Sequence, residues 1–251
     1  MFHLKRIHIQ KKWKMKKEGF SLIESLISMT LFSFMLISCL DFFCTARSHF
    51  FKLKSEQENK ESAFSALDKI RNDLLKGGLG LIAPSRLGII KGIRKNESGS
   101  LIILSKQKEL DIPEDLLTGQ TRISIESEKN IKKGREICIF DTHKGEIRCI
   151  SSIDNMSIIL TSPLSSSYQK ENTNIILLKK VTIFFDKNKS ILRRKVNSSP
   201  SQPLIEEVAA FEIDHEEFSN LVKLHLILKT MKEEKYEISV FPKNTALIFF
   251  N

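Results

Sequence analysis

One carboxylate stands alone in the most apolar part of the sequence. Between Phe20 and Leu40, Glu24 is the only Asp, Glu, Lys or Arg. A helix rises about 1.5 Å per residue, so this run is long enough to cross the ~30 Å hydrocarbon core of a bilayer. A charged group inside a membrane helix costs roughly 2.5–3.5 kcal/mol on insertion scales. Glu24 therefore requires a partner, and the chemistry expected of it is ion pairing.

A basic leader precedes this apolar run and ends at Gly19. Residues 1–19 hold seven Lys or Arg and one Glu, so they carry six of the ten net positive charges of the chain. The positive-inside rule then predicts a cytoplasmic N-terminus and an exported remainder. A conventional secretory signal has its small-residue cleavage site after the apolar region, whereas Gly19 lies before it. Translation from Met1 or from Met15 yields the same chain after Gly19.

The stretch Lys16-Lys17-Glu18-Gly19-Phe20-Ser21-Leu22-Ile23-Glu24 resembles the class III signal of the type IV pilin superfamily. The resemblance implies that a prepilin peptidase cuts between Gly19 and Phe20 and that the new amine of Phe20 is N-methylated. Glu24 matches the glutamate at the fifth position of the mature chain. The resemblance also implies that Glu24 pairs with the Phe20 amine of a neighbouring subunit.

Two other interpretations of this region remain open. In the first, the segment is an uncleaved signal anchor, and Glu24 snorkels or pairs locally. In the second, Leu36-Ile37-Ser38-Cys39 acts as a lipobox, and Cys39 is lipidated after removal of everything before it.

A single long helix is expected to continue beyond the membrane segment. Apolar residues recur there at spacings of three and four, which is typical of one helix face. They are Phe42, Phe43, Phe50, Phe51, Leu53, Phe64, Leu67, Ile70, Leu74 and Leu75. Gly77-Gly78 then predicts a helix stop. The expected segments are a leader (1–19), a transmembrane helix (20–40), its amphipathic continuation (41–76) and an exported strand-rich domain (77–251).

The sequence after Gly80 alternates short apolar runs with turn residues, which predicts antiparallel strands. The expected strands are 101–105, 121–126, 136–140, 146–150, 156–161, 174–185, 190–196, 209–215, 221–229 and 236–240. A helix followed by strands predicts an α+β fold, in which the apolar stripe of the helix covers one sheet face.

Part of the C-terminal half gives a second resemblance. The segments Val181–Asp186, Leu192–Arg194 and Gln202–Val208, followed by Phe211, resemble the minor pseudopilin J of type II secretion and the W-type minor pilins. There a strand, a turn, a Leu-Arg pair and a short crossover precede the final strands. This resemblance implies a minor pilin or pseudopilin subunit.

Two of the four cysteines are candidates for a disulfide. Cys39 and Cys44 are five residues apart on one helix and point to different faces. Cys138 and Cys149 flank a predicted hairpin, and a four-residue loop closed by Asp141 and Glu146 would place them opposite each other. Opposite residues approach to about 4.5–5.5 Å, within disulfide range, and an exported domain meets an oxidising compartment.

Candidates for catalysis and metal binding are sparse. The segment His215–Ser219 begins like a zincin motif but has Ser219 where the second histidine is required. His215 and His225 alone do not define a zinc site. Gly77–Gly80 ends a helix, whereas a phosphate loop begins one. We expect no enzymatic activity, no cofactor and no metal.

Two basic patches allow a function in DNA uptake as an alternative. They are the run from Lys129 to Arg135, with Lys132, Lys133 and Arg135, and the cluster Arg193-Arg194-Lys195, without interleaved aromatic residues. The favoured interpretation is a non-enzymatic, single-pass inner-membrane subunit that assembles into a type IV pilus or type II secretion pseudopilus. Its expected partners are other pilin-like subunits, the prepilin peptidase and an inner-membrane platform protein.

Overall fold

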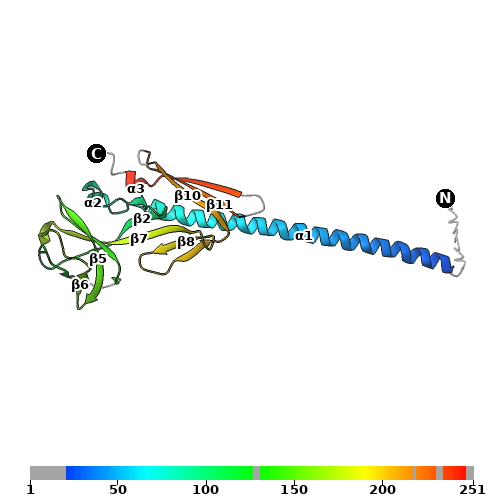
Figure 1. Cartoon of the computed structure of the whole chain (residues 1–251), viewed down its shortest axis with the longest axis horizontal. Coiled ribbons are helices and arrows are strands. Elements are labelled where there is room, and N and C mark those ends of the chain that lie inside the picture. The colour runs from blue at the N-terminus through cyan, green and yellow to red at the C-terminus, as the bar shows by residue number, and fades with distance from the viewer. Residues whose placement is uncertain (1–20, 127–130, 217–218, 230–233, 247–251) are drawn as a thin grey trace, which may run out of the picture. The chain divides into compact units, whose positions relative to one another are not determined.

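The structure, a computed structural model, describes residues 21–126, 131–216, 219–229 and 234–246. The chain divides into two compact units, residues 1–58 and residues 59–251. A single helix, α1 (Leu22–Leu75), spans the boundary between them in sequence, and the strands all belong to the second unit. The fold class is α+β (Figure 1).

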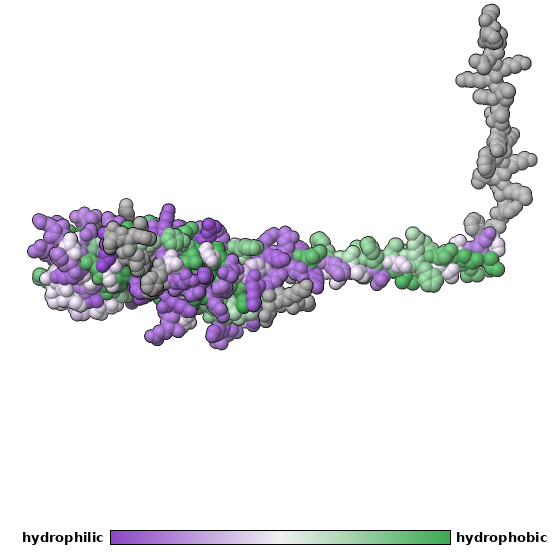
Figure 2. Space-filling model, turned by 90° about the horizontal axis from the view of Figure 1, so that it is seen from above, coloured by the Kyte–Doolittle hydropathy of each residue, from purple (hydrophilic) through white to green (hydrophobic). Residues whose placement is uncertain are grey.

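In the first unit, every described side chain from Ser21 to Lys54 is exposed. Figure 2 shows that the surface of this part of α1 is largely apolar. Within α1, this part is long and apolar enough, by length and composition, to cross a membrane. The predicted transmembrane helix is therefore a helix in the structure.

In the second unit, the last turns of α1 provide one side of a hydrophobic core, here called the helix core. Its helix residues recur every three or four positions. They are Ala63, Ala66, Leu67, Ile70 and Leu74. Phe64 was expected on the apolar face of the helix, and this prediction is wrong. Its side chain is 62% exposed, whereas the small side chain of Ala63 is fully buried.

The helix ends where the glycine pair predicted it. The N–H groups of Lys76 and Gly77 donate to the carbonyls of Asp73 and Leu74, and Gly78 has a φ of 74°. Such a left-handed conformation carries a penalty for residues with a Cβ, so glycine is favoured at this position. The side-chain amide of Asn244, far along the sequence, donates to the carbonyl of Leu75.

The larger sheet has nine antiparallel strands, in the order β1-β2-β7-β4-β5-β6-β3, with β8 paired to β7 and β9 to β8. These strands are β1 (Ile93–Lys95), β2 (Leu101–Leu110), β3 (Arg122–Ser124), β4 (Glu136–Phe140), β5 (Gly145–Asp154), β6 (Ser157–Leu160), β7 (Asn174–Asp186), β8 (Ile191–Val196) and β9 (Gln202–Ile205). Strand β2 follows β7 on one side, while β4 pairs with residues 174–177 and β8 with residues 181–186 on the other. The sheet therefore forks at β7.

The smaller sheet has the order β10-β11-β12, with β10 (Val208–Glu216), β11 (Leu221–Leu228) and β12 (Glu234–Val240). Every second residue of β11 is buried, as expected for a sheet with one solvated face. The helix core contains residues of both sheets as well as α1. The helix therefore packs against two sheets, not against one sheet face as expected, and Figure 1 shows β7 and β10 on either side of its last turns.

Two further clusters fill the larger sheet. Ile102, Leu104, Ile176 and Leu178 project to the face covered by Leu81 and Ile90. The other cluster lies among β3, β4, β5, β6 and the first half of β7. The first half of β2 (101–105) and the segment 175–178 of β7 are thus buried on both faces, which explains their continuous apolar runs.

The ten predicted strands are all present, with ends that differ by a few residues. The sequence analysis missed the short elements α2 (Ile82–Arg86), η1 (Lys170–Asn172), α3 (Lys243–Ala246), β1 and β9. Each has three to five residues, which is too short for a periodic signal. Pro203 within β9 also argued against a strand, and β9 pairs on one side only.

Candidate processing and assembly site

The predicted cleavage site, Gly19 and Phe20, lies outside the described residues. The first described residue is Ser21, which lies immediately before α1. The Ser21 N–H donates to Glu24 Oε2 at 3.0 Å, and Ser21 Oγ accepts a longer bond of 3.4 Å from the Ile23 N–H. This arrangement is a variant of the capping box: glutamate lies three residues after the N-cap serine, but Ser21 Oγ accepts from the N–H of Ile23 and not from that of Glu24. In the isolated chain, Glu24 therefore has a local partner.

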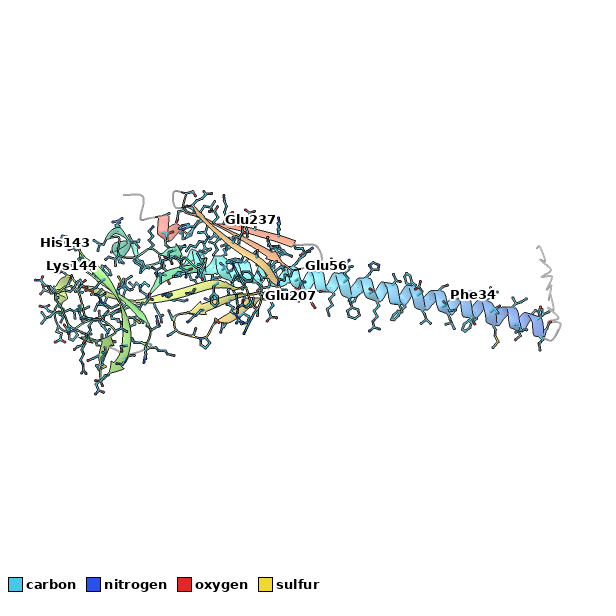
Figure 3. All side chains as sticks on the ribbon, in the orientation of Figure 1. Phe34, Glu56, His143, Lys144, Glu207 and Glu237 are labelled. Carbon is cyan, nitrogen blue, oxygen red and sulfur yellow. The ribbon has the colours of Figure 1, made fainter. Side chains whose placement is uncertain are left out.

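Two other polar side chains in the first turns of α1 also have hydrogen-bond partners within the helix. Thr30 Oγ1 donates to the Ile27 carbonyl and Ser33 Oγ to the Met29 carbonyl, each at 2.8 Å. These hydrogen bonds satisfy the two hydroxyl donors, so that neither is left unpaired on the apolar surface of the helix. Glu24 is left as the only formally charged side chain between Leu22 and Leu40. Figure 3 shows Phe34 projecting from the middle of this stretch.

The predicted opposition of Cys138 and Cys149 is wrong. Phe140 pairs with Gly145, so the turn contains residues 141–144, and Cys138 lies opposite Ile147 while Cys149 lies opposite Glu136. The two cysteines are diagonal neighbours, which are about 7–8 Å apart, and both thiols are free. Burial raises the pKa of the Cys138 thiol to about 12.

The register is set by the turn, whose His143 and Lys144 are labelled in Figure 3. Asp141 Oδ1 accepts the backbone N–H groups of His143 and Lys144 at 2.7 and 2.8 Å. These two hydrogen bonds contribute to a lowered pKa of Asp141 against the opposing effect of burial. The sequence analysis placed the closing pair one residue later on each strand than the structure does.

The two predicted basic patches are only partly available to a ligand. Arg194 donates from Nε and Nη2 to the carboxylate of Asp73 on α1, at 2.5 and 2.9 Å. This hydrogen-bonded pair raises the pKa of Arg194. Arg193 Nε lies 3.2 Å from Asp186 Oδ2.

In the other patch, Lys132 and Lys133 are exposed, whereas Arg135 is buried. Arg135 Nη2 donates to Gln107 Oε1 and to the Leu178 carbonyl, both at 2.6 Å. Burial lowers the pKa of this guanidinium. The first residues of this patch lie outside the described part of the chain. Neither patch presents three free cations among the described residues, so the structure lends no support to DNA binding.

The histidines considered for a metal site do not converge. His215 lies opposite Val222, and His225 lies opposite Glu212 on β10 and Glu237 on β12. His225 Nδ1 is 3.6 Å from Glu237 Oε2. Within the described ranges, no three side chains from His, Cys, Asp and Glu are placed to hold a metal ion.

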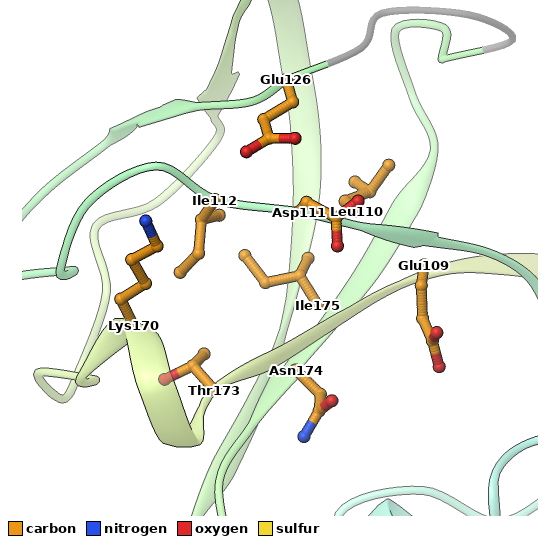
Figure 4. A pocket seen from close by; sticks show the side chains of 9 residues that line it. All are labelled: Glu109, Leu110, Asp111, Ile112, Glu126, Lys170, Thr173, Asn174 and Ile175. Atoms are coloured by element: carbon orange, nitrogen blue, oxygen red, sulfur yellow. The ribbon is translucent and has the colours of Figure 1, made fainter.

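A polar hollow of about 330 Å³ opens where β2 ends and β7 begins (Figure 4). Glu109, Asp111 and Glu126 line it together with Lys170. Acidic side chains that share a hollow are usually solvated, and these do not form a ligand set among the described residues. The hollow carries no evidence of catalysis.

The sequence analysis missed the polar contacts that link distant segments. Glu146 accepts hydrogen bonds from the N–H groups of Ser165 and Ser166 and from the Tyr168 hydroxyl, and it pairs with Arg148. No local sequence signal predicts the contacts of Glu146 with Ser165, Ser166 and Tyr168, because the partners are 19 to 22 residues apart.

Comparison with known proteins identifies one segment. Residues 14–40 match the prokaryotic N-terminal methylation motif. No curated protein is significantly similar to the chain.

Three phage tailspikes show weak structural similarity. They are those of Acinetobacter baumannii bacteriophage AP22 (TM-score 0.28, 15% identity, 31% of this chain and 15% of the tailspike), Pseudomonas phage LKA1 (0.25, 17%, 28% and 14%) and Pseudomonas phage phi297 (0.26, 12%, 30% and 14%). The chain therefore spans only about one seventh of each tailspike, and TM-scores this low carry no argument. The methylation motif and the long apolar helix that follows it make the N-terminal segment of this chain type IV pilin-like, and they fit a membrane-anchored protein.

Proposed function

We propose that this protein is a non-enzymatic minor pilin or pseudopilin, which is cleaved between Gly19 and Phe20 and assembled through α1. The observation that carries the proposal is the match of residues 14–40 to the methylation motif, which lies directly before and within a membrane-length apolar run whose one formal charge is Glu24. The N-terminus lies in the cytoplasm and the second unit on the outer side of the inner membrane. The proposal includes a pilin-like arrangement, and the packing of strand residues on the last turns of α1 supports it.

Assembly follows from the cost of an unpaired charge in an apolar medium. Cleavage creates an amine at Phe20, which is methylated and positively charged. In a cleaved subunit, Glu24 gives up its hydrogen bond with the Ser21 N–H. It forms an ion pair with the Phe20 amine of a neighbouring subunit instead. One contact then removes two isolated charges from the membrane, which favours association. The partners are other pilin-like subunits, the peptidase and an inner-membrane platform protein.

The mature N-terminus tests the processing step. The full chain is produced in a bacterium that has a prepilin peptidase, and the purified protein is analysed by mass spectrometry. A chain that begins with N-methylated Phe20 is expected. An intact leader would contradict the proposal, and an acylated Cys39 would replace it with a lipoprotein.

Glu24→Gln tests the assembly step separately. This variant keeps a hydrogen-bond acceptor for Ser21 but cannot form the ion pair, so processing is expected to continue while recovery in sheared fibres falls at least tenfold, the effect of about 1.4 kcal/mol. Glu56→Gln, on the same helix beyond the apolar stretch, is the matched control. Equal recovery of the two variants would refute a pairing role for Glu24.

A further inference from the structure

One face of α1 in the first unit carries two cations and then a carboxylate. Arg47, Phe51, Lys54 and Glu58 follow one another at spacings of four, three and four residues, so they project from the same face. All four side chains are exposed, and those of Lys54 and Glu58 are 57% and 65% exposed. These four residues are called the charged stripe below.

Within one chain, the charged stripe makes two contacts between residues four apart. The Arg47 guanidinium lies over the Phe51 ring, 5.6 Å from its centroid. Lys54 Nζ lies 3.8 Å from Glu58 Oε1. Exposed contacts of this kind are weak, so an adjacent helix with the same groups can exchange with them at little cost.

We propose that the charged stripe sets the axial offset between the α1 helices of two copies of this chain. The proposal rests on the proposed function, which anchors neighbouring subunits in one membrane with their helices parallel. In register, Arg47, Lys54 and Glu58 would each face the same residue of the second copy, and all three contacts would be repulsive.

A displacement of four residues, about 6 Å along the axis, removes this repulsion. Lys54 then faces Glu58 of the second copy, and Arg47 faces Phe51 of the second copy. The two contacts within each chain are thereby reproduced between chains. The charged stripe is self-complementary only when the helices are displaced.

The native Cys44 allows a test that leaves the charged stripe intact. One tagged copy carries Cys39→Ser and keeps Cys44; a second, with another tag, carries Cys39→Ser, Cys44→Ser and Ser48→Cys. The full chains are co-expressed and oxidised mildly in membranes. The disulfide between positions 44 and 48 is expected to exceed the disulfide between two Cys44 thiols. Dominance of the second product, or cross-links to other proteins alone, would overturn the proposal.

Charge reversal identifies the cause of the offset. Lys54→Glu in both copies is expected to lower the 44–48 product about two- to fivefold, as the loss of an exposed ion pair would. Lys52→Glu makes the same charge change away from the charged stripe and should leave the product unchanged. Equal losses in the two variants would refute the mechanism. Mature Phe20 in the same samples separates this failure from failure of the proposed function.

Discussion

At the scale of single residues, the role of Glu24 depends on its position in an apolar helix and on its hydrogen bond with Ser21. The sequence shows an isolated carboxylate, and the structure adds that this carboxylate closes a variant capping box with Ser21. A capping box is worth about 1 kcal/mol, which is less than the cost of a charge inside the membrane. The local bond therefore stabilises the start of the helix without removing the drive towards an ion pair in the proposed fibre.

The Asp73–Arg194 pair is the residue contact with the largest expected effect on stability. Its side chains are 9% and 12% exposed, and removal of one partner leaves a charge with little access to water. Asp73→Asn is expected to lower the free energy of unfolding by about 3 kcal/mol. Urea unfolding of the detergent-solubilised chain, followed by circular dichroism, measures this change.

A second variant distinguishes the contribution of the ion pair from the cost of leaving one buried charge without its partner. Asp73→Leu combined with Arg194→Met replaces both partners by apolar groups and is expected to recover most of the lost stability. The double variant would argue against a buried pair if it were less stable than Asp73→Asn. Asp68→Asn, on the exposed side of the same helix, is the matched control.

The two tyrosines of the chain should both resist ionisation. Burial, with a smaller effect of Glu146, raises the pKa of Tyr168, and burial together with Glu234 raises the pKa of Tyr236 to about 12. Unfolded tyrosine ionises near pH 10. The unfolded state alone loses these protons between pH 10 and about 12, so stability falls as the pH rises through this window.

Absorbance at 295 nm measures the ionisation of both tyrosines directly. The folded chain is expected to ionise well above pH 10, and the chain in urea near pH 10. Coincident titration curves in the two states would show that neither hydroxyl is protected. A partial shift would assign protection to one tyrosine, and Tyr236→Phe would identify which.

At the scale of elements, the end of α1 depends on a close approach of backbone segments. A Cβ at Gly78 would lie 2.8 Å from Thr245 Cγ2, and the φ of 74° would also be strained. Gly88 has a similar φ of 70°, but a Cβ there would meet nothing within 4 Å. Gly78→Ala is therefore expected to destabilise the fold by about 1–3 kcal/mol more than Gly88→Ala. Thermal or urea unfolding of both variants measures the difference, which would vanish if α3 were not packed against this turn.

The β4–β5 hairpin gives a redox prediction. Because Cys138 and Cys149 are diagonal and not opposite, the chain is expected to keep both thiols even under oxidising conditions. A maleimide reagent should label Cys149, which is half-buried, in the folded chain and Cys138 only after unfolding. Loss of both labelling reactions, restored by a reducing agent, would reveal a disulfide and a different register.

At the scale of the whole molecule, the second unit holds all the hydrophobic clusters of the described structure. Its helix core begins at Ala63, so deletion of residues 1–58 removes no buried core residue. The fragment 59–251 is expected to stay soluble without detergent and to unfold cooperatively. Circular dichroism and a urea titration test this expectation. A fragment that aggregates or lacks strand signal would show that the first part of α1 is required for folding.

The sequence alone determined the features that depend on composition and short-range spacing. The apolar run, its lone carboxylate, the basic N-terminal run, the glycine stop and the ten main strands are all readable as local patterns, because burial and backbone preferences repeat every two or three to four residues. The α+β class followed from the order of these elements. The prepilin-type segment could also be recognised from the sequence, because its motif lies in consecutive residues.

Only the tertiary structure decided which groups meet across long distances in the chain. It placed α1 against two sheets, moved the Cys138–Cys149 register by two residues, buried Arg135 and paired Arg194 with Asp73, 121 residues away. None of these outcomes follows from periodicity, because pairing depends on turn geometry and on which surfaces compete for the same buried space. Arg135 and Arg194, which the sequence analysis assigned to basic patches, therefore make hydrogen bonds and an ion pair within the fold.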